Sequence, residues 1–133
     1  MGVDTEQVVR SIYAGWNDDD FEAVARRLHP DVVWRPSRVL PGLDPVYHGQ
    51  DGVRRFWDGM KSSWDDVAVS IERAVVNDDL AVVTIRFEGV ERRSGKRFAV
   101  PFTHAWHCED GFVTRCSTFA GEEEALMRAA ELG

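Results

Sequence analysis

The stretch RFAVPFTHAWHCEDGFVTRCSTF, residues 97–119, decides the fold class of this chain. Asp110-Gly111 at its centre is a strong signal for a tight β-hairpin turn. The segments on either side, residues 97–109 and 112–119, have the apolar and β-branched content of strands. The stretch therefore predicts two long antiparallel strands joined by a short turn.

One face of the first of these strands carries a histidine among apolar side chains. Successive side chains of a strand point to opposite faces, so Phe102, His104, Trp106 and Cys108 are expected to share one side. A histidine in that position is either a core residue bonded to a neighbour or a titratable group that lines a cavity. His104 is therefore the first candidate functional residue.

The rest of the chain divides into helical segments followed by further strands. Apolar residues recur at helical spacing in the first 60 positions, and the period changes to two from Val67 onward. In chain order the predicted elements are a helix capped by Asp4, a second helix with the apolar stripe Phe21 to Leu28, a short strand at 31–35, a long loop at 36–49, a third helix capped by Gln50 or Asp51, a strand from Val67, a strand at 80–92, the two strands of 97–119 and a last helix after Gly121.

This order, ααβαββββα, is typical of an α+β fold, in one domain that spans residues 1–133. Long antiparallel strands twist and curl. We expect the curled antiparallel sheet to form a cone with helices packed over its concave face, and such a cone suits a small-molecule pocket. The loop at 36–49 is long for a compact domain, and long ordered loops are often functional lids.

Composition narrows the possible partners. The chain carries 16 basic and 23 acidic residues, a formal net charge of −7. Because phosphate binding needs clustered Lys and Arg, we expect no nucleic acid as partner. No apolar run approaches the roughly 20 residues of a membrane span, and the opening MGVDTEQVVR lacks the pattern of a secretory signal. With two cysteines and no disulfide framework, the sequence predicts a cytoplasmic protein without membrane contact.

Several local motifs carry a resemblance that extends over nearly the whole chain. They are Tyr13-x-x-Trp16-Asn17 with Phe21, LHPDVVW at 28–34, YHGQDGVRRFW at 47–57, Val100-Pro101, Glu109-Asp110-Gly111 and Glu124-Ala125-Leu126. Together with the order of the elements they resemble the nuclear-transport-factor-2-like superfamily, with its cystatin-like fold, and within it the SnoaL-like proteins. This superfamily hosts enzymes, binding proteins and assembly modules on one scaffold, so the resemblance is more specific for fold than for function.

The ketosteroid isomerases of this superfamily use a base aspartate at the end of the first strand and an oxyanion hole of a tyrosine and a protonated aspartate. The resemblance places these roles at Arg35 or Pro36, at Ile12 and at Thr103. Tyr13 is one residue away from the tyrosine position, about 100° around the helix. Isomerase chemistry by that route is therefore not expected.

The SnoaL-like polyketide cyclases carry an acid–base aspartate in a Val-Pro-x-x-Asp run. In this chain the run begins at Val100-Pro101 and ends at His104, so a histidine replaces the carboxylate. Histidine can also act in general acid–base catalysis, because its unperturbed pKa of ~6.5 lies near neutral pH. The resemblance thus implies His104 as the catalytic residue.

The two comparisons disagree about which face of this strand lines the cavity. A two-residue turn at Asp110-Gly111 would place His104 opposite Ser117 and Thr103 opposite Thr118. The isomerase comparison turns odd-numbered residues inward, whereas the cyclase comparison turns His104 inward. Both can hold only with a bulge, which we place at Pro101 because proline lacks a ladder donor. We favour the alternative in which His104 and Trp106 face inward.

The expected site therefore combines His104 with a set of aromatic and hydroxyl side chains. The predicted ligand-pocket residues are Tyr13, Trp16, Trp34, Phe56, Thr103, Trp106 and Thr118. Neither a cofactor nor a metal is expected, since His104 and His107 lie three apart on a strand and face opposite ways.

Besides a pocket that binds without reacting, as a sensor or carrier, the sequence supports two hypotheses about function. In the first, the protein binds a small hydrophobic organic molecule, and the resemblance implies cofactor-free proton transfer next to a carbonyl: cyclisation, isomerisation or dehydration. In the alternative, it is a non-catalytic dimerising or protein-interaction module, with Phe102, His104, Trp106 and Phe119 in the interface. A homodimer is expected as its assembly.

Overall fold

The computed structural model describes residues 4–37, 40 and 42–132 of the chain. Its elements, in chain order, are α1 (Thr5–Asn17), α2 (Phe21–Ala25), β1 (Leu28–Arg35), β2 (Tyr47–His48), α3 (Gly49–Ser63), β3 (Trp64–Asn77), β4 (Leu80–Glu91), β5 (Arg97–Glu109), β6 (Phe112–Phe119) and α4 (Glu122–Leu132). This is the predicted order with the short strand β2 added.

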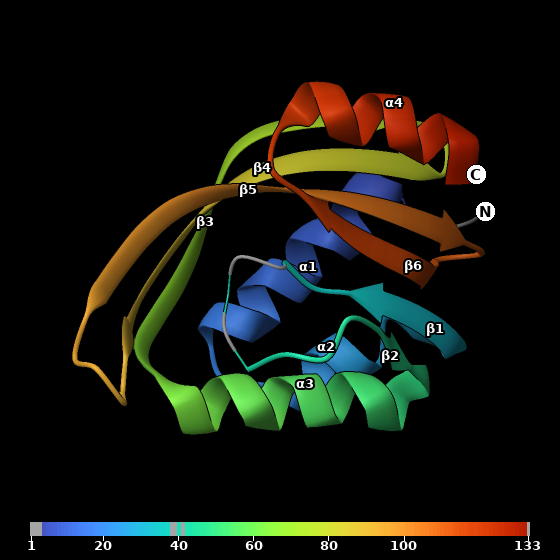
Figure 1. The fold of residues 1–133 in the computed structure, drawn as a ribbon. Coiled ribbons are helices and arrows are strands. Elements are labelled where there is room, and N and C mark those ends of the chain that lie inside the picture. Colours follow the sequence, from blue (N-terminus) through green and yellow to red (C-terminus); the bar gives the residue numbers. More distant parts are fainter. Residues whose placement is uncertain (1–3, 38–39, 41, 133) are drawn as a thin grey trace.

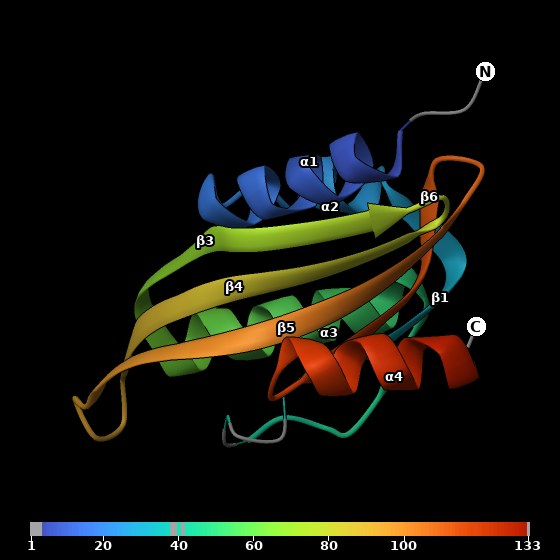
Figure 2. The ribbon, with the colours of Figure 1, turned by 90° about the horizontal axis from the view of Figure 1, so that it is seen from above.

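The strands form one curled, unclosed sheet in the order β2-β1-β6-β5-β4-β3. All neighbouring strands are antiparallel except β1 and β6, which run parallel. Helices α1 and α3 lie inside the curl, whereas α4 lies outside it (Figure 1). The view from above places α1 and α4 on opposite sides of β3–β5 (Figure 2). The α+β fold is confirmed, and α4 does not share the concave side of the sheet with α1 and α3 (Figure 1).

The first strand begins earlier than the sequence indicated. We expected Leu28 to end a helix, but α2 already ends at Ala25 and β1 begins at Leu28. The physical reason is a tertiary contact, because Leu28 pairs with Val113 of β6 and is buried. Pairing and burial outweigh the weak helical preference of one residue.

The third helix also begins differently. Neither Gln50 nor Asp51 caps it: α3 starts at Gly49, and His48 at the N-cap makes no side-chain cap bond. The Gln50 amide instead donates to the carbonyl of Leu28 at 2.9 Å. The predicted caps are therefore wrong, and one of them ties α3 to the start of β1.

A bulge near the β5–β6 turn sets the register of the site. Glu109 pairs with Phe112 as a two-residue turn requires, but the register shifts by one between Cys108 and His107. Beyond the shift His104 pairs with Thr118 rather than with Ser117. Pro101 keeps regular register with β4, so the predicted bulge at Pro101 is wrong. With the bulge beside the turn, His104 and Thr118 share the concave face.

Candidate functional site

The concave face of the sheet and the helices inside the curl enclose an apolar hollow, here called the inner cavity. It measures about 570 Å³ up to its open mouth, and about 60 Å³ of this admits the centre of a water molecule. Of the predicted site residues, seven lie in its wall: Tyr13, Trp16, Trp34, Phe56, His104, Trp106 and Thr118. None of the described residues in the wall is an Asp, Glu, Lys or Arg.

A chain of hydrogen bonds links three of these side chains. The indole N–H of Trp106 donates to the Tyr13 hydroxyl oxygen at 2.8 Å. The same hydroxyl lies 2.7 Å from Nδ1 of His104. Tyr13 comes from α1 and the other two from β5, two positions apart on its inward face. Helix and strand therefore meet at a buried polar chain inside an otherwise apolar wall.

The direction of these bonds assigns the histidine tautomer. A tyrosine hydroxyl carries one proton, and an indole nitrogen can only donate. With Trp106 already donating to its oxygen, Tyr13 keeps its own proton paired by donating it to His104 Nδ1. The opposite arrangement would leave a buried hydroxyl proton unpaired, at a cost of about 1–3 kcal/mol. His104 therefore carries its proton on Nε2.

The Nε2–H group of His104 is open to the inner cavity. Nε2 has no hydrogen-bond partner among the described residues. Among those residues, Ser117 Oγ is the one side-chain N or O atom that is both inaccessible and without a partner, so Nε2 is accessible. His104 itself is only partly buried and lies in the cavity wall. The site thus presents one N–H donor to whatever enters.

Burial keeps both members of the Tyr13–His104 pair neutral. Desolvation lowers the pKa of His104 from 6.5 to about 4. Burial, with a smaller contribution from Cys116, raises the pKa of Tyr13 well above its usual value, and the hydrogen bond from Trp106 opposes that shift. At neutral pH His104 is therefore an uncharged imidazole, and a hydrogen-bond donor through Nε2.

Aromatic contacts fix the walls around this donor. Trp34 packs against Phe56 and Trp106 with ring centroids 5.3 and 5.4 Å apart. Trp16 stacks on Phe56 at 5.7 Å and meets Trp57 edge-on at 4.7 Å. Rings held on two sides have little freedom to rotate. The cavity shape near His104 is thus set by packed side chains rather than by a loop.

Thr103 does not belong to this site. Its side chain lies on the opposite face of β5, where its hydroxyl is 3.1 Å from the Thr84 hydroxyl. The alternation of side chains explains the correction, because His104 faces inward and its neighbour must then face outward. The isomerase comparison, which turned odd positions inward, gave the wrong face.

Other wall residues lacked a signal of their own in the sequence. Pro36, Ser37 and Leu40 come from the long loop after β1, which was expected to be functional only as a whole. Met60 of α3 lies on the buried stripe of its helix, at the spacing of an ordinary core residue. It is buried and also lines the cavity. A stripe at helical spacing cannot separate these two environments.

The described residues form neither a metal-binding cluster nor a membrane-spanning helix. Within residues 4–37, 40 and 42–132, no group of three or more His, Cys, Asp or Glu side chains is arranged to hold a metal ion. In the same part of the chain, every helix is too short or too polar to cross a membrane. Cys108 and Cys116 are free, buried thiols.

The chain matches the model of one protein family over most of its length. The profile of the SnoaL-like domain matches residues 9–116. The chain belongs to the SnoaL-like family. A comparison with curated proteins finds no match.

Solved structures share the fold of this SnoaL-like protein at low sequence identity. TerC, co-crystallised with polyporic acid, is 23% identical over 96% of this chain and 98% of its own, with a TM-score of 0.78. An NTF2-like protein from Burkholderia thailandensis E264 is 22% identical over 97% of both chains, with a TM-score of 0.79. A protein of ketosteroid isomerase-like fold from Catenulispora acidiphila DSM 44928, in complex with trimethylamine, is 15% identical over 92% of both chains, with a TM-score of 0.75.

Proposed function

We propose that this protein binds a small, uncharged, largely apolar organic molecule in the inner cavity, through a carbonyl oxygen that accepts a hydrogen bond from His104 Nε2–H. One observation carries the proposal: the Trp106–Tyr13–His104 chain commits Nδ1 and leaves Nε2–H as a donor toward the cavity. The Thr118 hydroxyl, opposite His104 in the sheet, is a second polar group in the wall.

The chemistry of the wall selects an uncharged ligand. Burying an ion without a partner costs far more than burying a neutral polar group. The described wall offers no charged side chain to pair with such an ion. A carbonyl needs only one donor, and the aromatic side chains contact the apolar remainder. An aryl ketone is the simplest molecule that combines these features.

The structural relatives agree with this use of the scaffold. The TerC crystals contain polyporic acid, and the Catenulispora protein is in complex with trimethylamine. Both are organic molecules on proteins of the same fold. They support a small-molecule ligand for this chain, while its identity follows from the wall of its own cavity.

The proposed chemistry beyond binding is stabilisation of an enolate. A hydroxide ion from the solvent that takes a proton from the carbon next to the bound carbonyl becomes water, the C–H electron pair moves onto the carbonyl oxygen, and an N–H donor already in place stabilises that charge. A neutral histidine can serve as this electrophile. In its assigned tautomer His104 has no free lone pair, so it acts as donor and not as the base that removes the proton.

Ligand titration tests the proposal. Acetophenone and ethylbenzene have similar shapes, but only the ketone has an acceptor, and quenching of tryptophan fluorescence reports binding because Trp16, Trp34 and Trp106 lie in the wall. His104→Phe should weaken acetophenone binding by roughly 3- to 10-fold, the value of one hydrogen bond, and leave ethylbenzene binding unchanged. His104→Gln, which keeps an N–H donor, should lose less affinity for acetophenone than His104→Phe does.

The matched control is His107→Phe, a histidine on the outward face of the same strand. It should bind both compounds like the wild type. Absence of saturable acetophenone binding to the wild type, or equal binding by wild type and His104→Phe, would exclude the proposed donor.

The alternative hypothesis of an interaction module stays a prediction, but two of its four interface residues point inward. Phe102 and Trp106 are buried in the wall of the inner cavity, so neither can contact a partner from the outer face of the sheet. The homodimer itself stays a prediction, checked by light scattering against twice the chain mass of 15.1 kDa. The cytoplasmic location also stays a prediction, compatible with two free thiols.

A further inference from the structure

A second hollow, here called the outer chamber, lies beside the inner cavity. It measures about 630 Å³, and about 230 Å³ of it admits the centre of a water molecule. Trp16, Met60, Trp64 and Val67 contribute apolar surface, and polar groups including Asp66 stand among them. The outer chamber therefore offers more free space than the inner cavity, in a more polar setting.

Two residues line both spaces. Trp16 and Met60 are the residues common to the described walls of the inner cavity and the outer chamber. One comes from α1 and the other from α3, so the two helices meet at this division. Each of these side chains therefore forms part of the wall between the two spaces.

Met60 is the movable half of the division. Trp16 is held by ring contacts with Phe56 and Trp57. A methionine side chain is unbranched, rotates about three bonds and adapts to irregular space. Met60 can therefore change rotamer without breaking a ring contact, whereas rotation of Trp16 would break two.

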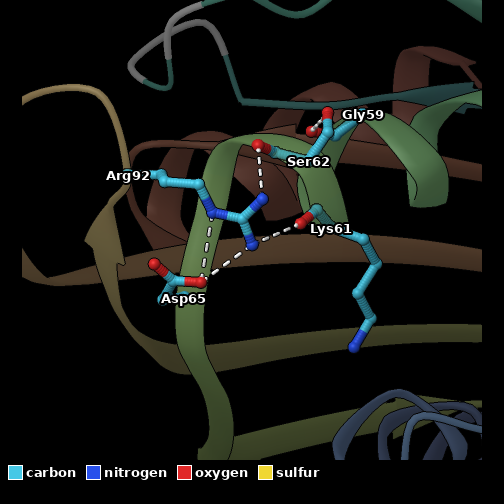
Figure 3. Close-up of polar contacts among 5 residues, drawn as sticks. All are labelled: Gly59, Lys61, Ser62, Asp65 and Arg92. Atoms are coloured by element: carbon cyan, nitrogen blue, oxygen red, sulfur yellow. Dashed lines mark hydrogen bonds and ion pairs between the residues drawn. The ribbon is translucent and has the colours of Figure 1, made fainter.

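The backbone on the C-terminal side of Met60 is fixed. The Arg92 guanidinium donates to the carbonyls of Lys61 and Ser62, both at 3.2 Å, and to the Asp65 carboxylate at 2.8 Å (Figure 3). These bonds hold the last turn of α3 against the strand that follows. The methionine side chain can thus move while the helix that carries it stays in place.

Charge in the outer chamber favours a neutral ligand group. Lys61 forms an ion pair with Asp19 at 2.6 Å, and Arg92 forms one with Asp65 at 2.8 Å. Both cations of the described chamber wall are thus engaged, and Asp66 adds a negative charge. An anionic group would be repelled, whereas hydroxyl and ether oxygens can bond to water and to the exposed polar rim.

We propose that the inner cavity and the outer chamber are two halves of one site for an elongated molecule. Its apolar ketone end lies against His104, its neutral hydroxylated tail lies in the outer chamber, and Met60 sets the length that the site accepts. This inference rests on the proposed function, because it takes the position of the ketone from His104. It adds the shape and polarity of the ligand and names Met60 as the specificity-determining residue.

The test compares acetophenone with the same ketone carrying a para di(ethylene glycol) ether tail. Wild type should bind the long ketone more weakly than Met60→Ala does, by roughly tenfold, equivalent to about 1.4 kcal/mol. The affinity of each protein for acetophenone is measured as the reference, because Met60 also lines the inner cavity, and the prediction concerns the ratio of the two affinities. Met60→Leu, which conserves volume, should keep the wild-type ratio.

A second variant probes the chamber without touching the inner cavity. Val67 lines the outer chamber and does not line the inner cavity. Val67→Trp should weaken binding of the long ketone and leave the affinity for acetophenone unchanged. This variant tests the proposal even if Met60→Ala does not fold. If acetophenone binds but neither variant changes the affinity for the long ketone, the divided site is wrong and the proposed function stands. If acetophenone does not bind the wild type, the proposed function itself fails.

Discussion

At the scale of single residues, binding of the proposed ketone depends on the protonation of one imidazole. His104 lies in an apolar wall, where its charged form would lose its hydration. The Tyr13 hydroxyl occupies Nδ1, and the proton on Nε2 faces the cavity. A side chain that titrates near neutral pH in water is thus kept as a neutral donor.

The stability of the fold should report this neutral state. The folded-state pKa of His104 is about 4 and its ordinary value is 6.5. Between these two pH values the imidazole is protonated in the unfolded chain and neutral in the folded chain. Stability is then fully present above pH 6.5 and falls as the pH is lowered toward 4, by roughly 3 kcal/mol at most. Urea unfolding across this range measures the loss.

Replacing His104 by Phe should flatten most of that pH dependence. His107, whose pKa is also lowered by burial and by Arg115, contributes in the same direction and is measured separately with His107→Phe. A stability profile of His104→Phe as steep as that of the wild type would show that His104 is not the neutral group.

The hydroxyl of Tyr13 should matter more for stability than that of Tyr47, the other buried tyrosine. Tyr13→Phe leaves the Trp106 indole N–H and His104 Nδ1 without a partner, and each buried unpaired group costs about 1–3 kcal/mol. Tyr47→Phe is the matched control, because its hydroxyl accepts one bond, from the Asp44 amide at 2.9 Å. In urea unfolding, Tyr13→Phe should lower the free energy of unfolding more than Tyr47→Phe does. Equal losses of unfolding free energy would contradict the hydrogen-bond chain.

At the scale of elements, the sequence predicted those strand and turn boundaries that neighbouring residues determine. The hairpin of β5 and β6 has the predicted boundaries, because Asp110 and Gly111 both adopt positive φ, at 53° and 84°, as a tight turn of this type requires. The start of β1 at Leu28 was missed because its partner Val113 is distant in the sequence. The bulge that places Thr118 beside His104 leaves no composition signal.

The end of α3 makes a prediction at the same scale. Arg92 caps its last carbonyls and pairs with Asp65, whose pKa it lowers through their hydrogen bond. Arg92→Met should therefore lower the urea midpoint, because orphan carbonyls at a helix C-terminus lose a cationic partner. Arg93→Met, an exposed neighbour, is the control. Identical midpoints for the two variants would remove the capping role.

At the scale of the whole molecule, the fold and the cavity arise from one arrangement, while the ligand is set by a few side chains. The curled sheet holds α1 and α3 inside its concave face (Figure 1), and the space left between them is the inner cavity. The sequence predicted this scaffold and most of the wall, because the resemblance to SnoaL-like proteins implied the cavity and apolar periodicity indicated which faces are buried. It could not predict the division at Met60 or the position of Thr103, which depend on register and on packing between distant elements.

The most direct test of the central claim is the infrared carbonyl stretch of carbon-13-labelled acetophenone bound to the protein. A hydrogen bond from His104 Nε2–H polarises the carbonyl, so the bound ketone should absorb at lower frequency in the wild type than in His104→Phe. The shift should return in His104→Gln and persist at neutral pH, where the imidazole is uncharged. A bound ketone with the same frequency in wild type and His104→Phe would contradict the account.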